Sequence, residues 1–313
     1  MKEVTSRGSR LPIKQLLLAL GVMATLYAAV LLIWGDRQVT SLSLLWSWTG
    51  LQAAGLCIIN YLLRGTRWRL WMARYGRDLG WRTGLRFYLA GYTFTPTPGN
   101  VGESVRGMML ADKPLGTAES LAIFGAERLA DFVCLVLLCT PALLWALTHD
   151  VVQARPGLWL VLTGAVVALV ALVLFLFARY RQRLFLRFDW LQQAWHCLSV
   201  RPLIWFALTI TAWAAQGLAV WLICRALGMH MHVLTAMGFY AVAMVAGALS
   251  ALPAGLGGME AVLTGLLLLQ GVPTGQAVAA TVLVRLLTLW LAVGIGVVSL
   301  IYSAAIRKDI SFS

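Results

Sequence analysis

The chain has 313 residues, of which 60% are hydrophobic and only 12% are charged, and its mean hydropathy is +0.82. Soluble domains carry about twice that charged fraction. The composition therefore excludes a soluble enzyme and predicts a single integral membrane domain over 1–313, of the all-α polytopic class. The net charge of +13 does not indicate a nucleic-acid partner, because the basic residues gather at the ends of apolar stretches, where they orient a membrane protein.

Six apolar stretches are long enough to span a bilayer as helices. They lie near 13–33, 45–63, 118–148, 157–178, 202–224 and 277–305. The first follows four basic residues and resembles a signal peptide. It is long for one, however, and Trp34-Gly35-Asp36-Arg37 is not a small-residue cleavage site. We therefore expect a retained helix.

Two further stretches are apolar but broken by proline and glycine, near 84–112 and 233–271. The residues that break them are Pro96, Pro98, Gly99 and Gly102 in the first, and Pro253, Gly255, Gly257 and Gly258 in the second. Each centre is predicted to be an unwound turn, because proline removes an amide donor and glycine weakens a helix.

Unwound backbone is tolerated at membrane depth only inside protein or beside a wet cavity. We therefore interpret both stretches as re-entrant hairpins whose turns meet inside the protein. The alternative is two ordinary helices per stretch. The first stretch is short for two crossings, whereas the second is long enough for two short spans.

The charges predict the orientation. With the N-terminus in the cytoplasm and each hairpin returning to its own side, 20 of the 25 basic residues lie on the cytoplasmic side, as the positive-inside rule requires. Both termini are then cytoplasmic, in a bacterial inner membrane. Three crossings separate the hairpins, which predicts an inverted-topology repeat with copies over approximately 45–148 and 202–305.

The repeat has a fixed offset of 157 residues. Pro96, Glu103 and Arg128 are followed at that distance by Pro253, Glu260 and Arg285. Broken segments in corresponding halves are typical of a transporter's binding site.

The four charged residues of the repeat are the main candidate binding groups. Glu103 and Glu260 each follow a glycine-rich turn, where an acid either caps a helix or binds a ligand. Arg128 and Arg285 each lie about ten residues into a spanning helix, where an arginine requires a partner or water. Pairing within each repeat and pairing across the repeats are both open, as are a structural ion pair and a clamp for an anionic phosphate.

The first copy carries additional charges, Glu127 and Asp131, where the second has Val284 and Thr288. This departure from symmetry suggests that one site couples to protons or cations. Asn100 in the first turn either binds a headgroup or only suits the turn. Arg106 either binds a headgroup or extends to the membrane surface.

The remaining polar features have simpler interpretations. The arginine-rich segment from Arg64 to Arg86 also contains Trp68, Trp71 and Trp81, and is predicted to lie at the interface on anionic lipid. The scattered cysteines and histidines predict neither a disulfide framework nor a metal site, and no cofactor is expected. No nucleotide-binding loop of the G-x-x-x-x-G-K-[ST] type occurs in the sequence.

Together these motifs carry a family resemblance. The run from Thr97 to Glu103, the segment from Ala126 to Asp131, the run from Pro253 to Glu260, and Arg285 resemble the lysylphosphatidylglycerol synthase transmembrane family, also called flippase-like. Larger members of that family fuse this region to a transferase domain that modifies a lipid, and the membrane part is thought to translocate it. We expect a stand-alone membrane part, because the longest hydrophilic segments run to about 20 residues. The resemblance then implies that the chain translocates a lipid and does not synthesise one.

The sequence therefore predicts a lipid flippase or transporter that moves a phosphate-bearing headgroup by alternating access without ATP hydrolysis. A membrane lipid is the expected partner, with a separate lipid-modifying enzyme as a second one. Two alternatives remain: an intramembrane enzyme acting on a lipid-linked substrate, and a non-catalytic membrane partner of a separate synthase.

Overall fold

The computed structural model describes residue 25 and residues 41–97, 99–109, 114–148, 179–180, 188–250 and 252–310. Within these residues the elements are helices and no strand occurs. Three helical segments are long and apolar enough to cross a membrane: Thr117–Thr148, Pro202–Ala226 and Thr274–Ala305. They confirm the spans predicted near 118–148, 202–224 and 277–305, so the chain is a polytopic helical membrane protein. The predicted spans near 13–33 and 157–178 lie outside the described residues, Thr25 apart.

Helix α3 extends the predicted span at 45–63. After the short helix η1 (Ser43–Trp46), α3 runs over Trp48–Arg74 and is capped by the Ser47 side chain, which accepts a hydrogen bond from the Gly50 amide at 3.2 Å. Its 27 residues make it about 40 Å long. The prediction that the segment from Arg64 onwards lies at the membrane interface is wrong for its first part, because Arg64, Arg67 and the two tryptophans of α3's last turns are buried in the core.

The two longest spans begin and end at equivalent positions of the two copies. Thr117–Thr148 consists of α5 (Thr117–Leu138) and α6 (Thr140–Thr148). Thr274–Ala305 consists of α13 (Thr274–Arg285), the π-helix η4 (Leu286–Trp290) and most of α14 (Leu291–Ile310). The first residues of the two spans are 157 positions apart, and so are their last residues. The π-helix frees backbone carbonyls, and Tyr61 of α3 donates its hydroxyl hydrogen to those of Leu287 and Thr288 at 3.0 and 3.2 Å.

Each broken stretch folds as two short helical arms around a turn. The arms of the first are α4 (Trp81–Ala90) continued by η2 (Gly91–Phe94), and the 3-10 helix η3 (Val101–Met109). The arms of the second are α11 (Val233–Leu249) and α12 (Gly258–Leu269). The second arm α12 has 12 residues, so it is about 18 Å long and falls short of the ~30 Å hydrocarbon core. The arm lengths therefore favour hairpins over pairs of full crossings in both stretches.

The turns share one backbone feature. Asn100 and Gly257, each three residues before the repeat glutamate, have positive φ angles of 56° and 86°. Asparagine and glycine are the residues that adopt this conformation most readily. Gly255 has a φ of 65° and approaches the backbone of Gly247 so closely that a Cβ would lie 3.0 Å from it. Pro98 lies outside the described residues.

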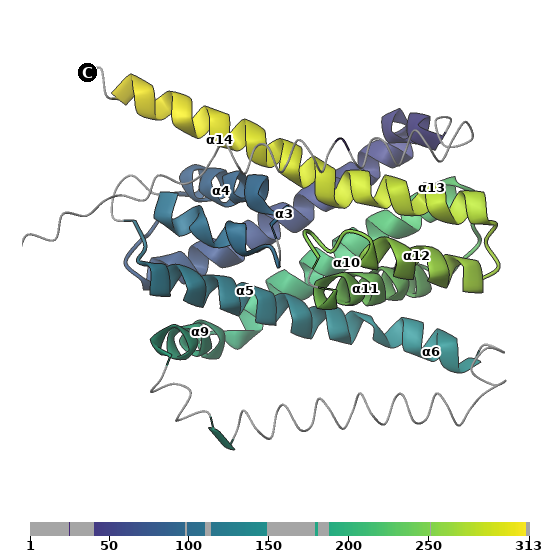
Figure 1. Ribbon diagram of the computed structural model, residues 1–313, viewed down its shortest axis with the longest axis horizontal. Helices are drawn as coiled ribbons and strands as arrows, with labels where there is room; N and C mark the ends of the chain where they lie inside the picture. Colours follow the sequence, from purple (N-terminus) through teal and green to yellow (C-terminus); the bar gives the residue numbers. More distant parts are fainter. Residues whose placement is uncertain are drawn as a thin grey trace, which may run out of the picture.

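The two halves pack reciprocally. Helix α3 packs along α10 (Pro202–Ala226), with the Asn60 amide donating to the Ala212 carbonyl at 2.8 Å. Helix α6 packs on α11 of the second hairpin, and α14 packs on α4 and η2 of the first. Figure 1 shows α14 along one side and α5–α6 along the other, with α10, α11 and α12 between them. Helix α9 (Asp189–Ser199) packs on α5.

Candidate functional site

The turns of both hairpins line one cavity of about 500 Å³. Gly99 and Asn100 come from the first turn, and Ala254 and Gly255 from the second. Arg128 and Arg285 line the same cavity. The rest of the wall is mainly apolar and comes from α5, α10 and α11, including Leu129, Phe132, Leu135, Trp213, Met244 and Val245. The structure thus brings together the turns and arginines that the sequence repeat singled out.

A smaller cavity of about 80 Å³ lies against the same groups. Its lining again includes Asn100 and Ala254 of the two turns together with Arg128 and Arg285. Glu103 and Arg64 join them there. The polar side chains therefore converge at the place where the two hairpin turns approach each other.

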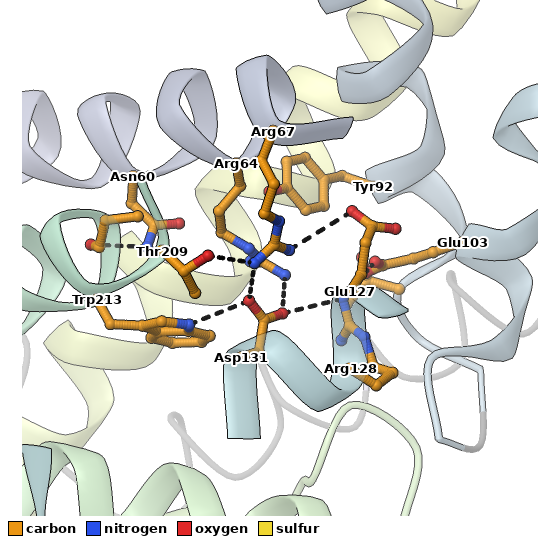
Figure 2. Close-up of polar contacts among 12 residues, drawn as sticks. Asn60, Arg64, Arg67, Tyr92, Glu103, Glu127, Arg128, Asp131, Thr209 and Trp213 are labelled. Atoms are coloured by element: carbon orange, nitrogen blue, oxygen red, sulfur yellow. Dashed lines mark hydrogen bonds and ion pairs between the residues drawn. The ribbon is translucent and has the colours of Figure 1, made fainter. Parts of the chain in front are cut away.

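Asp131 of α5 is the centre of a buried ion network (Figure 2). Arg64 and Arg67 of α3 each donate to its carboxylate at 2.8 Å, and the Trp213 indole of α10 donates at 3.2 Å. The Arg67 guanidinium also donates to the Thr209 hydroxyl at 2.8 Å. One carboxylate thereby connects three helices.

Arg106 lies between two carboxylates. It donates to Glu103 three residues before it and to Glu127 of α5, the latter at 3.0 Å. Its guanidinium carbon lies 4.3 Å from the centre of the Tyr88 ring, where a cation–π contact is favourable. Because this side chain is buried, the interpretation that Arg106 extends to the membrane surface is wrong. Glu103 also accepts a hydrogen bond from the Thr95 hydroxyl at 2.7 Å.

Arg128 is the most exposed arginine of the cluster. Its side chain is 30% exposed, and it contacts Glu103 at 3.3 Å and Asp131 at 3.4 Å. Its Nε atom is buried and has no hydrogen-bond partner. Both of its carboxylate partners are already bound by other arginines at shorter distances.

Arg285 is the counterpart of Arg128 but has different surroundings. Its side chain is 3% exposed, and its Nε atom donates to Glu260 at 2.6 Å. Its Nη2 atom donates to the carbonyls of Ala254 and Gly255 in the turn, at 3.3 and 3.0 Å. Glu260 in turn caps α12 by accepting from the Gly257 amide at 2.8 Å. Both arginines therefore pair within their own repeat, which decides the question that the sequence left open.

Sequence reasoning missed Arg64, Arg67, Thr209 and Trp213 as members of the cluster. A signal for the two arginines existed, because residues three apart lie on one face of a helix. Glu127 and Asp131, four apart on α5, form a matching acidic face. Among the described residues, no group of three or more histidine, cysteine, aspartate or glutamate side chains is arranged to hold a metal ion.

The sequence of the chain is similar to those of known membrane proteins. The model of the family described as lysylphosphatidylglycerol synthase TM region matches residues 15–296. A UPF0104 membrane protein of Methanothermobacter thermautotrophicus is 29% identical over 93 residues, which are 30% of this chain and 28% of that protein. The match therefore spans less than a third of that relative. No solved structure matches the chain at a significant level.

Proposed function

Because this chain belongs to the lysylphosphatidylglycerol synthase TM-region family, we propose that it is a lipid translocase of a bacterial inner membrane. It moves a phosphate-bearing headgroup through the cavity between the two hairpin turns, and no ATP hydrolysis is involved. The observation that carries the proposal is the cavity itself, because Arg128, Arg285 and both turns line it. Guanidinium groups beside unwound backbone are suited to a phosphate.

The wall of the cavity supports lateral entry of a lipid. Leu129 and Phe132 of α5 and Leu252 beside the second turn line the cavity and are exposed rather than packed in the core. An apolar wall lets acyl chains lie against apolar side chains while a headgroup occupies the polar end of the cavity. The entry then lies between α5 and α11.

In this proposal the two halves of the protein move relative to each other. We interpret repeat one, approximately 45–148, and repeat two, approximately 202–305, as an inverted pair with cytoplasmic termini. Each half carries its own ion pair, Glu103 with Arg128 and Glu260 with Arg285. Because each of these pairs is confined to one half, a movement of the halves against each other leaves both pairs intact. The same movement must rearrange the hydrogen bonds of Arg67 and Asp131 with Thr209 and Trp213 of α10.

Reconstitution tests this function. The purified protein is placed in liposomes with an acyl-labelled phospholipid, and transfer between leaflets is followed without nucleotide. We expect faster transfer than in protein-free liposomes, with unchanged lipid masses. A new lipid species in the mass spectrum indicates the intramembrane enzyme instead. Thermal melting shows whether the reconstituted protein is folded. If folded protein neither transfers nor converts the lipid, the result contradicts translocation and indicates a non-catalytic partner of a separate lipid-modifying enzyme.

A further inference from the structure

The charges around the cavity do not balance. Five arginines and four carboxylates form the cluster: Arg64, Arg67, Arg106, Arg128 and Arg285, with Glu103, Glu127, Asp131 and Glu260. Arginine stays protonated in proteins, and each carboxylate has an arginine within 3.0 Å. Among the described residues that form this cluster, one positive charge is in excess.

Arg128 carries the excess charge. Glu103 and Asp131, which it contacts, already have closer arginine partners in Arg106, Arg64 and Arg67. Repeat two adds no imbalance, because Glu260 and Arg285 form a one-to-one pair. Arg128 is also the cluster's most exposed arginine, and its side chain lines the cavity. The uncompensated charge therefore faces the cavity.

An uncompensated cation beside an apolar wall favours an anionic ligand. Within membrane depth a lone charge is costly, so occupation by a group of opposite sign is stabilising. One negative charge makes the cluster neutral. A zwitterionic headgroup has no net charge and leaves the excess in place, whereas a headgroup of net positive charge increases it.

We propose that the headgroup bound at Arg128 carries one net negative charge, as a glycerophospholipid with a single phosphodiester does. This inference rests on the proposed function and names its substrate class. Arg128 contacts the phosphodiester oxygens, and Arg285 keeps the second turn in place. The buried network of Arg64, Arg67 and Asp131 holds the surrounding helices, and Asp131 and Arg64 also line the two cavities.

The test compares three lipids with identical labelled acyl chains in liposomes that contain the protein: phosphatidylglycerol, phosphatidylcholine and lysyl-phosphatidylglycerol. Their headgroups have net charges of about −1, 0 and +1. We expect transfer of phosphatidylglycerol to exceed that of the other two by about tenfold, which corresponds to ~1.4 kcal/mol. Equal transfer of all three overturns the charge proposal and leaves the translocase intact. Transfer of none overturns the translocase itself.

Two variants assign the selectivity to Arg128. R128Q removes the excess charge and is expected to reduce the preference for phosphatidylglycerol to nearly equal rates. R128K keeps the charge and is expected to retain most of the preference. A preference that persists unchanged in folded R128Q contradicts the role of Arg128. If R128Q does not fold, the wild-type series of three lipids still decides whether net charge is selected.

Discussion

Arg128 and Arg285 occupy equivalent positions but have different chemical roles in the structure. Arg285 is almost fully buried and binds one carboxylate and two turn carbonyls. Arg128 is 30% exposed and shares carboxylates that other arginines already hold. The sequence left both a structural ion pair and an anion clamp open for each of the two arginines. Both arginines line the cavity, but Arg285 is also bound to the backbone of the second turn, whereas Arg128 is the more exposed of the two.

This difference predicts that the same substitution costs much more stability at Arg285 than at Arg128. R285Q leaves Glu260 and two carbonyls without their donor, and should lower the free energy of unfolding by about 2–4 kcal/mol. R128Q should lower it by less than about 1 kcal/mol, since its ion pairs are long and partly exposed. Thermal melting of both variants in one detergent measures the difference. Equal losses would contradict the division of roles.

At the scale of elements, Asp131 joins α3, α5 and α10. It accepts hydrogen bonds from Arg64, Arg67 and Trp213, and no equivalent acid exists in the second half, where Thr288 stands at that position. We predict that D131N destabilises the protein by about 3 kcal/mol, because two buried guanidinium groups lose their main counter-ion.

The control for D131N is D78N, at an exposed aspartate of the loop after α3. It should leave the melting temperature within about 1 °C of wild type, because a surface substitution of this kind changes stability little. If D131N melts as D78N does, the network does not hold the three helices together.

The contact between α14 and the first hairpin depends on a glycine. A Cβ at Gly296 would lie 2.6 Å from the Thr93 backbone nitrogen, whereas a Cβ at Gly294 would meet nothing within 4 Å. G296A should therefore force the helix away from η2 and cost about 1–3 kcal/mol. G294A on the same helix should have no such cost, and alanine is the better helix former. The melting temperatures of the two variants test this prediction. Equal values would show that α14 and η2 accommodate the added methyl group without strain.

The charged residues show most clearly which features of the site the sequence predicts and which it does not. The sequence predicted that the intramembrane charges of Glu103, Arg128, Glu260 and Arg285 have partners, because such a charge is costly alone, but it left pairing within and across the repeats open. The structure pairs each arginine with the glutamate of its own repeat. The same reasoning failed for Arg64 and Arg67. Hydropathy ends a span at the first arginine and cannot distinguish a guanidinium in the headgroup layer from one that a distant carboxylate neutralises.

At the scale of the whole molecule, the two halves are related by sequence offset and by reciprocal packing. Thr117 and Thr274 begin the two longest spans, are both exposed, and lie 157 residues apart. An inverted repeat places them on opposite sides of the membrane. We predict that T117C reacts with a membrane-impermeant thiol reagent only from the cytoplasm, and T274C only from outside.

The labelling requires a background without the five native cysteines, of which four are buried and Cys139 is partly exposed. Reaction of both introduced cysteines from the same side would mean that the two halves run in parallel. The reciprocal packing would then need another explanation.

The most direct test of a headgroup passage between the hairpin turns is a density map of the protein in nanodiscs of phosphatidylglycerol. The cavity lined by Asn100, Ala254 and Arg128 should hold headgroup density, with a phosphate oxygen about 2.7–3.2 Å from the Arg128 guanidinium. The acyl chains should leave between α5 and α11. A cavity filled only by acyl chains, with every ordered phosphate at the outer rim of the protein, would contradict the account.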